Sequence, residues 1–316
     1  MITDTDGKGY RIMTTEDGGV YEGIRSLWCA VFGDEPGFVD HVYRTFGRDI
    51  RGYAAAGRDG AVVSALTVYR CGSFEGKPVW VTYAVCTAPE HRGHGLAGML
   101  TERARDDVIS SGAISIVSPD DEELAGWYGK LGYVPCFYAS ERAALSPEFD
   151  DEEFDDFDGF DMDFGGEDRA APQPAIELKE LSPEVYSRYR EAFLDGRPHI
   201  VMSGDMMELE ASETIGGKGL YSVNGGDAIC AVLEADPLRV VLSELITNPM
   251  LLEISSDIDA EIASLIAGHF RAAECVYTTP GPGRCQSMIA GRPGTAAEPG
   301  EEPYLFEEAY FGFPIY

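Results

Sequence analysis

A buried strand, a glycine-rich turn and a helix follow one another within residues 79–100, and this stretch constrains the fold more than any other. Residues 79–87 read VWVTYAVCT, a short apolar run rich in β-branched and aromatic residues, which predicts a buried strand. The glycines of the turn allow successive N–H groups to point into one concavity, and the following helix adds the positive end of its dipole. We therefore predict a phosphate or pyrophosphate site formed by Arg92, Gly93, His94, Gly95, Leu96 and Ala97.

This turn differs from two common nucleotide-binding motifs. No lysine–serine pair follows the glycines, which argues against a P-loop triphosphatase. Gly93, Gly95 and Gly98 match the G-x-G-x-x-G spacing of dinucleotide-binding domains. However, the turn does not follow the first strand of a βαβ unit, and no acidic ribose-binding residue closes a second strand about 20 positions on. We therefore disfavour a Rossmann domain.

A second motif follows the turn. Residues 113–117 predict a short strand and residues 120–130 a helix, which runs into W-Y-G-K-L-G-Y at residues 127–133. Together with the P-E-H-R-G-H-G turn, this order resembles the GCN5-related N-acetyltransferase (GNAT) superfamily over roughly residues 10–144. The family's Q/R-x-x-G-x-G/A pattern is met by Arg92, Gly95 and Ala97. The resemblance implies an α/β protein with a mixed sheet in the acyl-CoA N-acyltransferase (GNAT) fold, with the order β-α-α-β-β-β-α-β-α-β.

The resemblance also implies the roles of individual residues. The strand before the turn and the next strand would part, and the pantetheine arm of acetyl-CoA, the co-substrate, would lie along Val85, Cys86 and Thr87. Backbone N–H groups of residues 92–97 would bind the pyrophosphate, aided by the Arg92 side chain. Tyr128 occupies the family's position for the acid that protonates the departing sulfur. No metal is implied.

The base that deprotonates the acceptor is less well marked. The central strand carries no carboxylate, which many relatives place there. Four side chains remain as candidates: Tyr83, His91, Asp34 and Glu35. A fifth is the terminal carboxylate of Tyr316, as in some multi-domain relatives of the Eis type, although an aromatic tail that merely packs is the simpler interpretation. We disfavour Cys86 as a nucleophile, because direct transfer needs no acyl-enzyme.

Composition limits the partners. The 316 residues carry a formal net charge of −31, which argues against nucleic acid and anionic membranes and favours cationic partners such as amines. The seven cysteines form no C-x-x-C or Cys/His metal pattern, so we expect reduced thiols. The polar N-terminus and the lack of long apolar runs predict a cytoplasmic protein without a membrane span. A homo-oligomer is compatible with the sequence.

The second half repeats the GNAT order weakly. The predicted domains are residues 1–145, an acidic Phe/Asp-rich linker at 146–174 that fails the EF-hand pattern, and a degenerate GNAT-like domain at 175–316. After the strand at 239–246 comes Thr247-Asn248-Pro249 in place of a glycine turn, so this domain should not bind coenzyme A. We expect it to shape the acceptor pocket or to support the first domain.

The sequence therefore predicts an N-acetyltransferase that moves an acetyl group from acetyl-CoA directly to a primary amine of a small cationic molecule. Two alternatives stay open. One is an inactive or weakly active acyl-CoA-binding scaffold, which the missing base favours. The other is a protein-lysine acetyltransferase.

Overall fold

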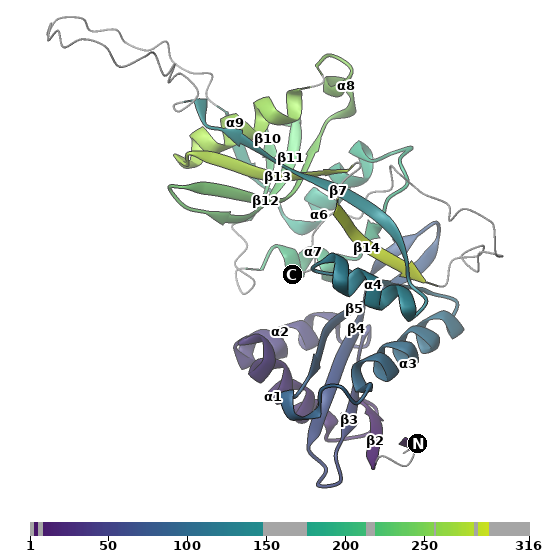
Figure 1. Cartoon of the computed structure of the whole chain (residues 1–316). Coiled ribbons are helices and arrows are strands. Elements are labelled where there is room, and N and C mark those ends of the chain that lie inside the picture. Colours follow the sequence, from purple (N-terminus) through teal and green to yellow (C-terminus); the bar gives the residue numbers. More distant parts are fainter. Residues whose placement is uncertain are drawn as a thin grey trace, which may run out of the picture. The chain divides into compact units, whose positions relative to one another are not determined.

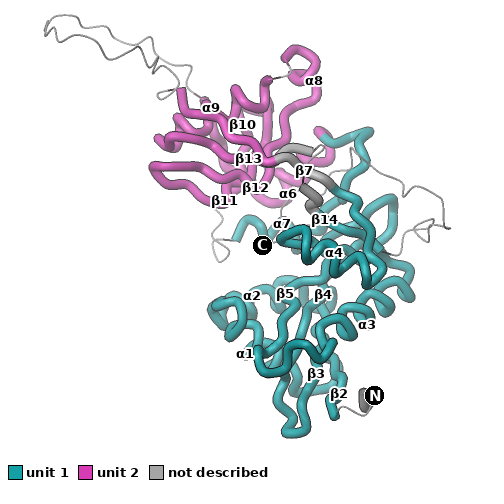
Figure 2. The backbone as a smooth tube through the Cα atoms, viewed as in Figure 1, with its two compact units in different colours: residues 1–140, 194–215, 280–316 teal, residues 141–193, 216–279 magenta. Residues whose placement is uncertain are grey.

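The computed structural model describes residues 3–5, 9–147, 176–212, 219–255, 257–280 and 284–290. The chain divides into two compact units, shown in Figure 2. The first comprises residues 1–140, 194–215 and 280–316, and the second comprises residues 141–193 and 216–279. The units thus differ from the continuous division expected at residues 145 and 175, because two later segments join the first unit.

The first unit is built on a mixed sheet (Figure 1). Its strands, in spatial order, are β1 (Thr3–Thr5), β2 (Tyr10–Thr14), β3 (Ile50–Ala56), β4 (Val62–Phe74), β5 (Lys77–Thr87), β6 (Ile114–Val117), β14 (Arg284–Ala290) and the first part of β7 (Val134–Leu145). Neighbouring strands are antiparallel except β5 and β6, which are parallel. The helical elements are α1 (Val20–Phe32), α2 (Pro36–Phe46), the 3-10 turn η1 (Pro89–His91), α3 (Leu96–Ser110), α4 (Glu122–Lys130) and α7 (Gly204–Glu210). The predicted mixed α/β fold is confirmed.

Helices α1 and α3 cover opposite faces of this sheet, because alternate residues of a strand face opposite sides. Leu96, Leu100 and Ala104 of α3 are buried with Tyr53 of β3 and Leu66 of β4. The next residues along the strands, Ala54 and Ala65, belong instead to the core under α1. Apolar residues at every fourth position of α3 therefore form its core-facing side.

Two segments distant in sequence complete the first unit. The short strand β9 (Val201–Met202) pairs with β4 at Gly72, and the Ser203 N–H donates to the Cys71 carbonyl oxygen at 2.8 Å. A Cβ at position 72 would lie 2.1 Å from the Val201 carbonyl oxygen, so only glycine allows this approach. Strand β14 lies between β6 and β7, where Met288 pairs with both strands. These pairings explain why the units do not follow a continuous boundary.

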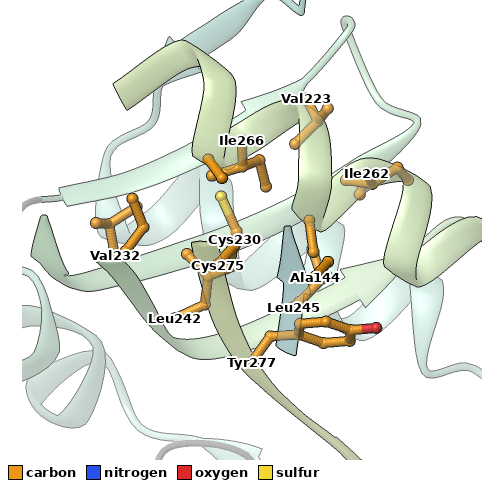
Figure 3. Close-up of a cluster of buried hydrophobic side chains, with 14 of the residues drawn as sticks. Ala144, Val223, Cys230, Val232, Leu242, Leu245, Ile262, Ile266, Cys275 and Tyr277 are labelled. Atoms are coloured by element: carbon orange, nitrogen blue, oxygen red, sulfur yellow. The ribbon is translucent and has the colours of Figure 1, made fainter. Parts of the chain in front are cut away.

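The second unit has its own mixed sheet. The strands, in order, are β13 (Glu274–Pro280), β12 (Arg239–Thr247), β11 (Ala228–Ala235), β10 (Gly219–Val223) and β8 (Leu178–Glu180). Its helices are α6 (Pro183–Phe193), α8 (Pro249–Leu252) and α9 (Ile258–Phe270). Strands β12 and β13 are parallel, and α9 lies in the connection between them. Figure 3 shows Ile262 and Ile266 of α9 in the same buried cluster as Cys230, Val232 and Leu242 of the sheet.

The end of β12 differs from the end of β5, its counterpart in the first unit. Asn248 follows the strand and caps the short helix α8 by accepting from the Met250 N–H at 3.1 Å. No described residue at this strand end forms a glycine turn, as the sequence predicts. Among the residues that the structure describes, none of the helices combines the length and apolar character needed to cross a bilayer.

Glu244 of β12 is buried in this unit and is fully engaged by two residues of α6. Its carboxylate accepts from the Tyr186 hydroxyl at 2.8 Å and from Arg190 Nε at 3.0 Å. All three side chains are inaccessible to solvent. This network satisfies the charges and fixes α6 on the sheet, which is a structural role.

Candidate active site

Strands β5 and β6 part beside a bulge. Their pairing ends where Thr82 faces Val117. Just beyond, the register between β4 and β5 shifts, so that Ala84 and Val85 lie opposite Leu66 alone. Ala84 has a φ of +52°, a left-handed conformation that is unusual for alanine and that bends the strand. The last part of β5 thus leaves β6 as the chain approaches the glycine turn, which is the opening expected for a pantetheine arm.

The glycine turn has the predicted conformation. Gly93 and Gly95 have φ of +77° and +79°, and a Cβ at either position would meet nothing within 4 Å. Gly95 is the N-cap of α3, whose first N–H groups have no acceptor within the helix. Arg92 Nε donates to the Thr87 carbonyl oxygen at 3.2 Å, which holds the exposed guanidinium between the strand end and the turn. The convergence of these N–H groups on a diphosphate stays a prediction.

Two histidines flank this turn. The hydroxyl of Tyr10 and Nδ1 of His91 are 3.0 Å apart, and the rings of Tyr10 and His94 are 6.1 Å apart. His94 Nδ1 lies 3.1 Å from the carbonyl oxygens of His91 and Arg92, so it donates. His91 therefore lies at the diphosphate end of the site, which makes it a poor candidate for the base.

The residues predicted to line the pantetheine arm offer mainly backbone. The Cys86 side chain is buried in the core under α1. Burial raises the pKa of its thiol to about 12, so the thiol stays protonated and is a weak nucleophile. The Thr87 hydroxyl lies 2.8 Å from Ser64 Oγ, and Val85 packs towards the core of α3. Hydrogen bonds to an extended ligand would therefore come from the N–H and C=O groups of this strand.

Tyr128 lies on α4 and is 8% exposed. Its ring contacts those of Trp127 and Tyr133 at centroid distances of 4.8 and 5.9 Å. Burial, and then the nearby Tyr133 and Asp120, raise the pKa of Tyr128 above its ordinary value. No described residue forms a hydrogen bond with its hydroxyl. Tyr128 therefore keeps its proton at neutral pH, as an acid must, while its role in transfer stays a prediction.

Beyond the opening, carboxylates from three elements surround Tyr83. Burial raises the pKa of Tyr83, followed by the charges of Asp34, Glu210 and Asp120. These residues come from the α1–α2 loop, the end of α7 and the β6–α4 loop. Sequence analysis missed Glu210 and Asp120, and no sequence signal places α7 beside β5.

Aromatic rings define the same end of the site. The Trp28 ring lies 5.3 Å from that of Tyr83 and 6.3 Å from that of Phe38, and the Tyr69 ring lies 5.8 Å from that of Tyr83. The Trp28 indole donates to Asp34 Oδ2 at 2.6 Å. In the described part of the chain, no group of three or more His, Cys, Asp or Glu residues is arranged to hold a metal ion.

Comparisons with known proteins support the fold described above. A sequence profile of the acetyltransferase (GNAT) family matches residues 20–133. The fold is similar to that of a conserved protein of unknown function from Enterococcus faecalis V583, a probable N-acyltransferase, at 13% identity and a TM-score of 0.60, covering 89% of this chain and 72% of that chain. A comparison with curated proteins found no match.

Two further solved structures show the same fold. Eis1 from Mycobacterium abscessus is 12% identical, with a TM-score of 0.55 and coverage of 89% of this chain and 72% of that chain. A tandem GNAT protein from the clavulanic acid biosynthesis pathway is 11% identical, with a TM-score of 0.52 and coverage of 90% and 99%. Each likeness extends over both units, which supports the tandem arrangement. Residues 20–133 therefore match the acetyltransferase (GNAT) family, and the fold of the chain is similar to that of a tandem GNAT protein.

Proposed function

We propose that this chain transfers an acetyl group from acetyl-CoA directly to a primary amine of a small cationic molecule. The observation that carries the proposal is the opening between β5 and β6, which leads from the glycine turn to Tyr83. A ligand with a diphosphate on the turn and an extended arm along residues 85–87 would present its thioester beside Tyr83. The donor would thus meet the acceptor where the carboxylates gather.

The transfer needs one proton donor and one proton acceptor. The amine nitrogen bonds to the acetyl carbon, the carbon–sulfur bond breaks, and the sulfur leaves with the electron pair. Tyr128 supplies a proton or a hydrogen bond to that sulfur and recovers a lost proton from water. Its raised pKa keeps the phenol protonated at neutral pH but also makes it a weaker proton donor. Because the Cys86 thiol is buried and protonated, an acyl-enzyme is not part of this scheme.

The charge of the site favours a cationic acceptor. The charges of Asp34, Glu210 and Asp120 all raise the pKa of Tyr83, and the whole chain carries a formal net charge of −31. Carboxylates beside aromatic rings hold ammonium groups through ion pairing and cation–π attraction. The same field opposes a polyanionic donor, so donor binding depends on the local N–H groups of the turn.

Binding and turnover test the proposal separately. Acetyl-CoA and desulfo-CoA should both raise the midpoint of thermal unfolding, and thiol release should follow when small amines are added. Stabilisation without turnover on any amine would favour the scaffold alternative. Acetylation of a lysine-rich protein but not of small amines would favour a protein-lysine acetyltransferase.

Two features expected to matter lie outside the described residues. These are the acidic segment at residues 149–168 and the terminal carboxylate of Tyr316. Deleting Tyr316 tests the second, since unchanged turnover would remove it as a base.

A further inference from the structure

The structure distinguishes among the four side chains that are candidates for the base. Burial raises the pKa of Tyr83, so its phenol keeps its proton at neutral pH and cannot accept one. His91 is bonded to Tyr10 at the diphosphate end of the site. Glu35 is exposed at the N-cap of α2 and makes no side-chain capping bond there. Asp34 remains, and its side chain is half-buried at the acceptor end.

One oxygen of Asp34 is held in place by the core. The Trp28 indole N–H donates to Oδ2 at 2.6 Å, and Trp28 itself is only 1% exposed. An indole locked in a packed core fixes the carboxylate that it binds. Within the described residues no donor binds Oδ1, so this second oxygen is available to a substrate.

Asp34 also lies where the acyl group would arrive. The Trp28 ring touches Tyr83, and Tyr83 directly follows Thr82, the last residue of β5 that pairs with β6. The charge of Asp34 acts on Tyr83 more strongly than that of any other carboxylate. The charges of Asp34 and Glu35 both act on Cys29 of α1, while those of Glu210 and Asp120 act on Tyr83 from α7 and the β6–α4 loop.

Resting on the proposed function, we propose that Asp34 is the base that removes the proton of the acceptor amine and that Trp28 is its positioning residue. The ammonium passes one proton to Oδ1, which frees the lone pair of the nitrogen to bond to the acetyl carbon. The nitrogen releases its second proton to water as the carbon–sulfur bond breaks, and the thiolate that leaves takes a proton from Tyr128. Asp34 then releases its proton to water.

Asp34→Asn tests the proposal, with Glu35→Gln as the matched control in the same loop. At pH 7 we expect Asp34→Asn to lower kcat/KM for the amine by about 10²-fold, the scale of a lost general base. The loss should shrink as the pH rises towards about 10, where an alkyl amine becomes neutral without help. Glu35→Gln should keep the wild-type rate and pH profile. Calorimetric affinity for acetyl-CoA should be the same in all three proteins.

Trp28→Phe tests the positioning role. This variant keeps an aromatic ring in the core but removes the N–H donor, so kcat should fall while donor affinity stays constant. In the Asp34→Asn background the same change should cause no further loss, because the partner of the indole is gone. If Trp28 has a purely structural role, Trp28→Phe should lower kcat by the same factor in both backgrounds. That result would overturn its positioning role.

The outcomes separate two claims. Suppose that the wild-type protein acetylates an amine. If kcat/KM of Asp34→Asn at pH 7 is then within about twofold of the wild-type value, instead of about 10²-fold lower, Asp34 is not the base. A loss confined to Glu35→Gln would transfer the role to Glu35. If wild-type protein binds acetyl-CoA but acetylates no amine at any pH, the proposed function fails and the base assignment fails with it.

Discussion

At the scale of single residues, the surroundings of each phenol decide its role. Tyr83 and Tyr128 are both held among packed side chains, and burial raises the pKa of each. A phenol in this state donates a proton or a hydrogen bond but does not act as a base. The sequence marks Tyr128 through the W-Y-G-K-L-G-Y motif, but it gives Asp34 no more weight than Glu35. In the structure, the indole bond from Trp28 and the half-buried position of Asp34 distinguish the two carboxylates.

Tyr128→Phe should lower kcat by about tenfold or more, because the thiolate then leaves without its proton donor. The KM for the donor should change little, since the turn that binds the diphosphate is untouched. Tyr83→Phe is the matched control, a second buried phenol at the site that should keep a near-wild-type rate. Steady-state kinetics with thiol detection measures both. An equal rate for Tyr128→Phe, or a large loss only in Tyr83→Phe, would contradict the assignment.

At the scale of elements, local sequence patterns predict most of the first unit. They fail for the segments that are distant in sequence and pair with its strands. The central strand β5, α3, β6 and α4 lie where the apolar runs, the glycine turn and the sequence motifs predict them. Strands β9 and β14 were not predicted, because each is short and is fixed by pairing with a distant strand. The carboxylate of Glu210 could not be foreseen for the same reason, since α7 follows β9 onto β4.

Gly72→Ala tests the docking of β9. A methyl group there would meet the Val201 carbonyl oxygen at 2.1 Å, and backbone cannot move aside cheaply. We expect a loss of about 1–3 kcal/mol in the free energy of unfolding, the range for overpacked sites. Thermal or urea unfolding measures it. Gly37→Ala, on an exposed helix position with open space, is the control, and an equal loss there would show that steric contact with β9 is not the cause.

Gly95→Ala tests the turn. Position 95 needs a positive φ, which costs an L-residue about 1–2 kcal/mol, so a shift of the backbone should misalign the N–H groups. We expect weaker binding of acetyl-CoA by calorimetry. Gly60→Ala carries the same strain in the distant β3–β4 hairpin, with a φ of +84°. It should lose stability but bind acetyl-CoA as the wild-type protein does. If Gly95→Ala and Gly60→Ala bind acetyl-CoA with equal affinity, this turn is not part of the donor site.

At the scale of the whole molecule, the charge of −31 should act in opposite directions on the two proposed substrates. Long-range attraction of a cationic amine and repulsion of a polyanionic donor are both screened by salt. Raising ionic strength from about 0.01 M to about 0.15 M, which shortens the Debye length from about 30 to about 8 Å, should raise the KM of the amine and lower that of acetyl-CoA. Initial-rate kinetics at two salt concentrations measures both. Shifts of the same sign would show that the net charge does not steer them.

The two-unit organisation predicts one donor site in each chain. The first unit has the glycine turn ahead of α3, and in the second unit Asn248 and α8 follow the corresponding strand. Calorimetric titration of the full chain with acetyl-CoA tests this central claim most directly. We predict one molecule bound per chain, with affinity reduced in Gly95→Ala. The absence of any heat of binding, or an affinity unchanged by Gly95→Ala, would contradict the account.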